Sequence, residues 1–421
     1  MASLSLLALF LTVTNFVPIS AIGFIPVVFC GWRFFGRSYP RFMTPLTVFT
    51  VFVTLSTLLY DRESFLDFDF YRRDGNFFIS YAPMFAGCLY IHHWDLNKIL
   101  RAFFGFAVVI NAPVYFLYIL QAGLLAIFKN QYDSFGSYFI ARNAAGGFLA
   151  MLFCLGTACY LQRRSVGILV LLVLNTAMLF STYSRGSLLG ALAALGYLVL
   201  RRKRWVFVTL IASLITASIG MAIYHTDPAV DYMGSPFLVH ADDPKAANLS
   251  IRYEWLWPRA LTYFEQSPIA GMGFGSFDDS IGSVVPYFGL FAEPSHISPE
   301  HSDSHAHNSY LNILAELGCV GLALMIQFYW RLIVWSRNGA AFYALLADGQ
   351  NFAAYRFVEI SSICLLTMSA TEHRLVSPSN VLILSLVVSL LLAWRPPSLQ
   401  ARAAGPNRIT QPVRRPSSET R

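Results

Sequence analysis

The residues best suited to chemistry lie at 301–321, where a polar, histidine-rich loop turns into an apolar helix. His305, His307 and Asn308 stand at the junction, and Glu316 follows within the predicted helix. Histidine titrates near neutral pH, and ionisable groups at a membrane boundary are usually functional. We therefore predict a site here in which one histidine acts as a general base. The alternative is that histidines in an exposed loop are incidental.

A metal site is the second chemistry to test in this stretch. His301 and His305 have the i, i+4 spacing of a helix, with Asp303 between them. The stretch lacks the intervening glutamate of an H-E-x-x-H motif, and Pro299 disfavours a helix through His301. We expect no metal and no other cofactor.

Glu316 lies nine residues after His307, which is about 13 Å along a helix. A carboxylate at that depth in a membrane is costly unless it is paired. We therefore expect an arginine from a neighbouring outer loop to be its partner.

Arg185 ends one apolar span and begins the next almost at once. Its guanidinium stays charged and offers planar donors that match phosphate oxygens. The alternative is an arginine that snorkels to anchor a helix end. Positive charge on an outer turn opposes the usual orientation rule, which favours a binding role.

Further arginines accompany Arg185 on the same predicted side. Arg252 and Arg259 are seven residues apart, so in a regular helix they share a face that suits an anionic lipid head group. Pairing with Glu254 or Glu265 at an exposed surface is the alternative. Arg142 opens another span and is expected to join the same basic ring.

Composition identifies the elements that must position these residues. The chain has 421 residues, of which 56% are hydrophobic and 13% charged, against about 25% charged in soluble domains. Apolar runs near 20 residues long indicate an integral membrane bundle of α-helices, not an outer-membrane barrel. The net charge of +7 comes from short loops and the tail, so it does not indicate nucleic-acid binding. All six cysteines fall in apolar segments, so no disulfide framework is expected.

Hydropathy predicts eleven or twelve transmembrane helices. Residues 3–32 form one span or a hairpin of two, and basic loops then alternate along the chain as the positive-inside rule requires. The other predicted spans are near 42–60, 77–93, 100–128, 144–161, 165–182, 187–200, 205–224, 309–330, 356–372 and 380–394, with an inside loop at 331–337 and an ambiguous surface segment at 340–355.

One large hydrophilic loop, residues 225–308, separates an N-terminal bundle (1–224) from C-terminal transmembrane helices (309–394). It holds six of the nine histidines but only three of the 30 basic residues, which favours the outer, periplasmic side. Within it, residues 250–266 read as a short amphipathic helix, and GMGFGSF at 271–277 allows close backbone approach. The basic tail, 395–421, is expected to be disordered and cytoplasmic.

These motifs together resemble the O-antigen ligase and polymerase family of bacterial envelope membrane proteins. The resemblance spans about 142–325 and is carried by Ser184, Arg185, Gly186 and Ser187, by Arg252, Trp257, Ala260 and Leu261, by Pro268 and the 271–277 glycines, and by His305, His307, Asn308, Leu311, Leu314, Glu316, Gly318 and Gly321.

The resemblance implies a metal-independent glycosyl transfer at the periplasmic face of the bacterial inner membrane. The donor is a glycan on undecaprenyl pyrophosphate, and the acceptor is a glycan or a lipid core, as in lipopolysaccharide or exopolysaccharide synthesis. The implied catalytic residues are His307, Arg252 and Arg185. The implied substrate-binding residues are Arg142, Arg259, His305, Asn308 and Glu316.

Three alternatives remain open from the sequence. The product is either a glycan attached to an acceptor or a polymer lengthened by lipid-linked repeat units. A transporter for the same lipid would carry ionisable groups near the bilayer midplane and repeated halves, whereas here the polar groups gather on one face. A non-catalytic assembly scaffold would not need several arginines around a histidine.

Overall fold

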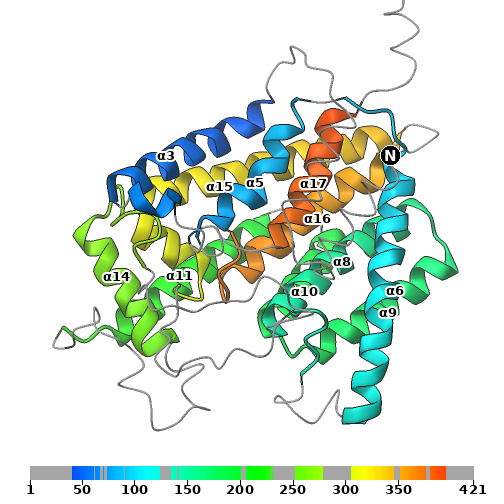
Figure 1. Cartoon of the computed structure of the whole chain (residues 1–421), viewed down its shortest axis with the longest axis horizontal. Coiled ribbons are helices and arrows are strands. Elements are labelled where there is room, and N and C mark those ends of the chain that lie inside the picture. Colours follow the sequence, from blue (N-terminus) through cyan, green and yellow to red (C-terminus); the bar gives the residue numbers. More distant parts are fainter. Residues whose placement is uncertain are drawn as a thin grey trace, which may run out of the picture.

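A computed structural model of the chain describes residues 40–60, 62–66, 70, 74–89, 91–123, 134–139, 142–200, 205–228, 230, 252–277, 305–345, 351–375 and 380–394. This described part is helical and has no strand, apart from one isolated bridge between His92 and Trp394. The predicted all-α class is therefore confirmed (Figure 1). The predicted first span or hairpin at 3–32 and the tail at 395–421 lie outside the described residues.

The described helices follow the hydropathy pattern closely. They are η1 (Arg41–Met43), α3 (Thr44–Tyr60), η2 (Arg62–Leu66), α5 (Asn76–Ala86), α6 (Leu96–Ala122), α8 (Arg142–Gln162), α9 (Val166–Ser181), α10 (Arg185–Leu200), α11 (Trp205–His225), the π-helix η3 (Arg252–Leu256), α14 (Trp257–Gln266), α15 (Ser309–Ala344), α16 (Phe352–Met368) and α17 (Asn380–Ala393). The amphipathic helix predicted at 250–266 is confirmed as η3 followed by α14.

Length and hydropathy identify membrane-crossing helices within this described part. Five are long and apolar enough to cross a membrane: Arg41–Tyr60, Leu96–Ala122, Arg142–Gln162, Val208–His225 and Ser309–Ala344. Three shorter helices, Val166–Ser181, Arg185–Leu200 and Asn380–Ala393, are also apolar. The chain is thus a multi-pass membrane protein, and the total of eleven or twelve spans stays a prediction.

Two predicted boundaries are wrong. The inside loop expected at 331–337 is helical, because α15 runs on to Ala344 and buries Ser336 and Ala340 on its last turns. The span expected at 77–93 is shorter, since α5 ends at Ala86. From there the chain runs beside α17, where Nε2 of His92 lies 2.8 Å from the Leu390 carbonyl oxygen.

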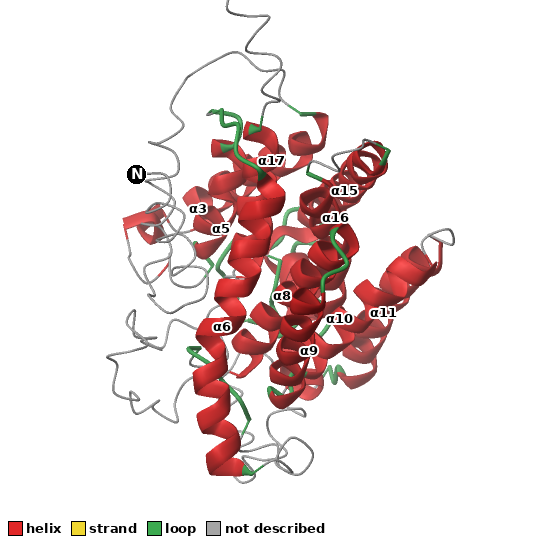
Figure 2. Ribbon diagram, turned by 90° about the vertical axis from the view of Figure 1, so that its right-hand side faces the viewer, coloured by secondary structure: helices red, strands yellow, loops and turns green. Residues whose placement is uncertain are grey.

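Helix α16 is the centre of the bundle. It contacts α15, α10, α8 and α17, and nearly every residue along it is buried. Helix α3 lies along α15, and α5 lies along α17 (Figure 1). Helix α11 stands at the edge of the bundle (Figure 2). The ends of α15 and α16 that meet near Asn308 therefore have helices around them on most sides.

A break in α15 brings the glycine-rich loop into the bundle. At Gly318 the backbone has φ 61° and ψ −164°, and a Cβ there would lie 2.3 Å from the carbonyl oxygen of Ile269. The amides of Met272 and Gly273 donate to the carbonyls of Ala315 and Glu316, both at 3.0 Å. The carbonyls of Pro268 and Ile269 accept from the amides of Cys319 (2.9 Å) and Val320 (3.3 Å). Backbone groups freed by the break are thus satisfied inside protein, as a membrane requires.

Candidate active site

The turn before α15 is locked in place by Asn308. Its side-chain oxygen accepts from the amides of Tyr310 (3.0 Å) and Leu311 (3.3 Å), which caps the helix. Its side-chain nitrogen donates to the carbonyl of Ala370 at 2.9 Å. Both ends of the Asn308 amide are therefore used by the fold, and the residue fixes the position of its neighbour His307, whose φ is 47°.

The loop between α16 and α17 lies directly against this turn. Ser309 Oγ donates to the carbonyl of Glu372 at 3.1 Å and accepts from the amides of Arg374 (2.5 Å) and Leu375 (3.1 Å). Glu372, His373 and Arg374 are all buried in this loop. None of these three residues belongs to the motifs discussed above. An acidic, an imidazole and a guanidinium side chain in a short loop between two apolar spans was the signal that could have found them.

Glu372 joins the predicted base to a predicted cation. One carboxylate oxygen lies 3.5 Å from Nδ1 of His307, and the other lies 3.7 Å from Nη1 of Arg252. Arg252 Nη1 also donates to the carbonyl of Thr371 at 3.1 Å. Burial alone would raise the pKa of the Glu372 carboxyl, but the contact with His307 and the charges of Arg374 and Arg252 outweigh it and lower that pKa to about 2. Glu372 is therefore ionised at neutral pH.

Three imidazole rings form one cluster. The ring centroids of His305 and His307 are 4.4 Å apart with the planes at 89°, and those of His305 and His373 are 4.9 Å apart and stacked. His373 Nε2 lies 3.9 Å from a carboxylate oxygen of Asp74, the residue two before α5. Burial, reinforced by the other two rings and Arg374, lowers the pKa of His373 well below its usual range. His373 is therefore neutral at pH 7.

Glu316 lies further inside, under the glycine-rich loop. It is 1% exposed, and its carboxylate accepts from the amide of Phe277 at 3.4 Å. The amide of Gly275 and the side chain of Asn312 also contact it, and Asp74 is close enough to repel it. The prediction that an arginine pairs with Glu316 is wrong for the described residues. Backbone amides of the inserted loop contact its carboxylate instead.

Of the four arginines predicted for the site, Arg185, Arg252 and Arg142 lie near the loop between α16 and α17, and Arg259 is buried elsewhere. Arg185 is exposed at the start of α10, and the next residue, Gly186, is so close to Thr371 that a Cβ would lie 2.1 Å from its hydroxyl. Arg185 and Arg252 thus approach the same loop. Arg142 begins α8, beside the Asn143 carbonyl that accepts from Arg374 at 2.6 Å.

Arg259 does not share a face with Arg252, so that prediction is wrong. It is 1% exposed and its Nη2 donates to the hydroxyl of Tyr263 at 3.2 Å. Its guanidinium carbon is 5.2 Å from the ring centroid of Phe277. The cause is η3, because a π-helical turn is wider than an α-helical turn and changes the angular register of the residues that follow.

The metal hypothesis finds no support in the part of the chain that is described, where no group of three or more His, Cys, Asp or Glu side chains is arranged to hold an ion. His301, one half of the i, i+4 pair, lies outside the described residues. His305, the other half, stacks on His373 instead.

Comparison with known families bears on this geometry directly. Residues 168–326 match the family model described as O-antigen ligase. This stretch is thus similar to an O-antigen ligase domain. The match runs from α9 to the middle of α15, so it contains Arg185, Arg252 and His307 and stops short of Glu372. No curated protein matched the chain. The family consists of membrane proteins that join lipid-linked glycans to acceptors, as ligases or polymerases.

Proposed function

We propose that this protein transfers a glycan from an undecaprenyl-pyrophosphate carrier to an acceptor hydroxyl at the periplasmic face of the inner membrane. The observation that carries the proposal is the position of Glu372, which contacts His307 and Arg252 with its two oxygens. A candidate base and a candidate pyrophosphate ligand therefore lie on either side of one carboxylate.

The proposed reaction forms a bond between the acceptor oxygen and the anomeric carbon of the donor glycan. The bond from that carbon to the pyrophosphate oxygen breaks, and the carrier leaves with the electron pair. With Nδ1 of His307 directed at Glu372, the acceptor proton goes to Nε2, and the carboxylate stabilises the imidazolium that forms. The pairing also fixes the ring orientation.

Arginines stabilise the leaving pyrophosphate in this scheme. Arg252 and the exposed Arg185 approach the same loop, and guanidinium groups match phosphate oxygens in pairs. The Nε atoms of Arg252 and Arg374 are buried and have no hydrogen-bond partner among the described residues. Buried donors of this kind are usually satisfied by a ligand or water. Fixed cations thereby supply the charge stabilisation that the leaving group needs.

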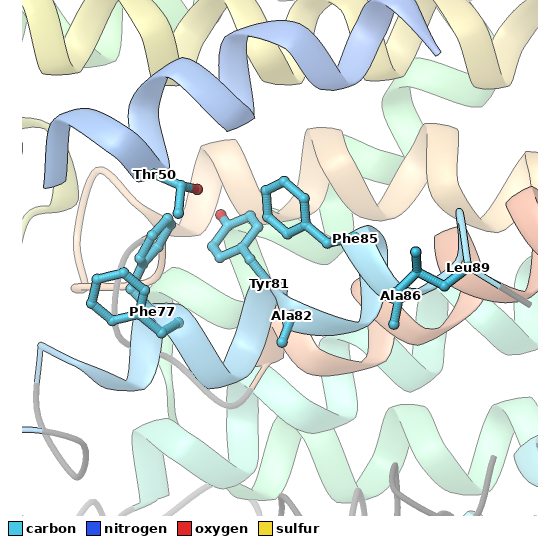
Figure 3. Close-up of a pocket in the computed structure, with 8 residues that line it drawn as sticks. Thr50, Phe77, Tyr81, Ala82, Phe85, Ala86 and Leu89 are labelled. Atoms are coloured by element: carbon cyan, nitrogen blue, oxygen red, sulfur yellow. The ribbon is translucent and has the colours of Figure 1, made fainter. Parts of the chain in front are cut away.

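A groove between α3 and α5 suits the carrier's polyprenyl chain. It is a cavity of about 360 Å³ lined by Phe77, Phe78, Tyr81, Phe85 and other apolar side chains. Figure 3 shows the rings of Tyr81 and Phe85 directed from α5 toward Thr50 on α3. The groove starts one turn after Asp74, which contacts the histidine cluster, and Phe77 packs on Phe274 of the glycine-rich loop. An isoprenoid chain leaving the site has a continuous apolar path here.

The periplasmic orientation rests on the basic loops and has its own test. Exposed Asp227, after α11, and exposed Arg164, between α8 and α9, lie at opposite ends of the predicted topology. With a membrane-impermeant thiol reagent on spheroplasts, Asp227→Cys should be labelled and Arg164→Cys should not. Labelling in the reverse pattern would put the histidine cluster on the cytoplasmic side.

Reconstitution tests the reaction. The purified protein in liposomes, given an undecaprenyl-pyrophosphate-linked glycan and an acceptor, should release undecaprenyl pyrophosphate in proportion to product, and His307→Ala should not. If the acceptor gains a single glycan of fixed size, the protein is a ligase. If the glycan products form a series of increasing chain lengths, it is a polymerase. Movement of the lipid-linked glycan across the liposome membrane with no release of the carrier would support the transporter alternative instead.

A further inference from the structure

A second cavity within the bundle includes none of the residues of the histidine cluster. It has a volume of about 240 Å³ and lies between α10, α11, α15 and α16. Its walls are aliphatic and aromatic, among them Ile211 and Ala212 of α11 and Trp330 and Ile333 of α15. Arg337 lies at one side of it. The proposed glycan transfer uses none of these residues.

The depth of Arg337 is set by α15 itself. It follows Gly318, where α15 breaks, by 19 positions, which is about 28 Å of helix at 1.5 Å per residue. The hydrocarbon core of a bilayer is about 30 Å thick. If α15 begins at one surface, Arg337 therefore reaches the head groups of the opposite leaflet. The neighbouring Trp330 and the exposed Trp205 at the start of α11 fit an interfacial belt.

The cavity carries positive charge that the described protein leaves uncompensated. Tyr197 donates its hydroxyl to Glu359 at 2.7 Å, and Glu359 also pairs with Arg356. The only carboxylate beside the cavity in these helices is thus already neutralised. Arg337 makes no hydrogen bond or ion pair with any described residue.

Loose packing of α11 opens the cavity toward lipid. Only 11% of its membrane-crossing window is buried, and its fully buried residue Ala222 lies near the other end, against α14 and η3. Helix α11 stands at the rim of the bundle (Figure 2). An acyl chain can therefore enter between α11 and α15 from the side.

We propose that this cavity binds one anionic glycerophospholipid of the leaflet opposite the histidine cluster, with its phosphate on Arg337 and an acyl chain along Ile211 and Ile333. A guanidinium matches a phosphate in a bidentate fashion, and basic pockets between transmembrane helices bind anionic head groups. The polyprenyl donor is the weaker candidate. Its pyrophosphate would lie at the other membrane face, so only its hydrocarbon end could reach this cavity. A hydrocarbon chain makes no favourable contact with the charge of Arg337.

Native mass spectrometry of the full-length protein tests the proposal. Protein exchanged into detergent with phosphatidylglycerol or phosphatidylcholine of matched acyl chains should retain one phosphatidylglycerol selectively. Arg337→Gln should weaken that binding by about tenfold or more, since it removes a charge-assisted contact. Arg337→Lys should keep part of it. Ala212→Trp, which fills the cavity, should abolish it.

Matched controls separate this site from general effects. Arg331→Gln removes the same charge from the same helix outside the cavity, where the side chain donates to the Arg41 carbonyl. Ala217→Trp adds the same bulk to an exposed position of α11. Both should bind phosphatidylglycerol as the wild type does. Equal retention of the two lipids, or equal loss in Arg337→Gln and Arg331→Gln, would overturn the proposal. So would stoichiometric displacement of the lipid by undecaprenyl phosphate together with loss of glycan transfer in Ala212→Trp.

Discussion

Glu372 lies with one carboxylate oxygen 3.5 Å from Nδ1 of His307, although 65 residues separate them in the chain. The sequence predicts arginines around His307 but no carboxylate beside it. The structure adds a carboxylate, which orients the ring and balances the charge that a base acquires. The histidine is thus held as part of a dyad.

Glu372→Gln tests the dyad at constant shape. The amide keeps the size of the side chain but removes the charge that stabilises the imidazolium, so transfer should fall at least about tenfold with the protein still inserted. Glycan product is measured at equal membrane levels. Glu265→Gln, an exposed change on α14, is the control and should be fully active. An active Glu372→Gln would reduce the pair to a structural contact.

The histidines should differ in importance. The rate of His307→Ala should fall by about 10² to 10⁴, because a general base is lost. His305→Ala should be intermediate, because its ring packs against those of His307 and His373. His301→Ala should be near wild type. Rates of glycan transfer rank the three variants. An inactive His301→Ala, together with inhibition by a chelator, would restore the metal hypothesis.

Arginine geometry should matter at the proposed pyrophosphate site. Arg252→Lys and Arg185→Lys keep the charge but lose the planar fork, so transfer should drop by about tenfold or more in each. Arg164→Lys, at the exposed turn between α8 and α9, is the matched control. Measurement of KM for the lipid-linked donor separates binding from folding. Two fully active lysine variants would leave these arginines as helix anchors.

Gly318→Ala should destabilise the protein. The added Cβ meets the Ile269 carbonyl at 2.3 Å in a left-handed backbone, so both strain and a clash arise. Gly220→Ala on α11, where nothing lies within 4 Å, should be neutral or slightly stabilising. The thermal midpoint in detergent gives the comparison. We expect a loss of about 2 kcal/mol or more for the first variant. Equal midpoints would mean that α15 is not broken at Gly318.

Stability should fall in two steps on acidification. His373 has a lowered pKa when folded, so the unfolded chain binds the proton first and stability declines once the pH drops below about 6.5. The second step comes from Glu372. Its contribution to the free energy of unfolding is present above about pH 4.5 and is lost as the pH falls toward its folded pKa of about 2. Thermal midpoints at pH 7.5, 5.5 and 3.5 report both steps. His373→Gln should flatten the first and Glu372→Gln the second, whereas exposed His93→Gln should change neither.

Local sequence features predict the all-α membrane class and most helix positions, which the described helices confirm. Apolar run length and polar residues at helix ends are local properties, so no knowledge of packing was needed. The same holds for the amphipathic helix around Arg252 and for the glycine-rich loop. In each case the chemistry of one short segment carries the prediction.

The surroundings of His307 depend on the packing of segments that lie far apart in the chain. Glu372 and His373 reach it because α15 and α16 pack side by side and their ends meet, and Asp74 comes from far earlier in the chain. Arg259 does not lie beside Arg252, because the π-helical turn between them changes the direction in which its side chain points. Glu316 accepts a hydrogen bond from a backbone amide, because the break in α15 at Gly318 lets the glycine-rich loop pack against the helix. Contacts between distant segments depend on packing geometry, which hydropathy and spacing do not encode.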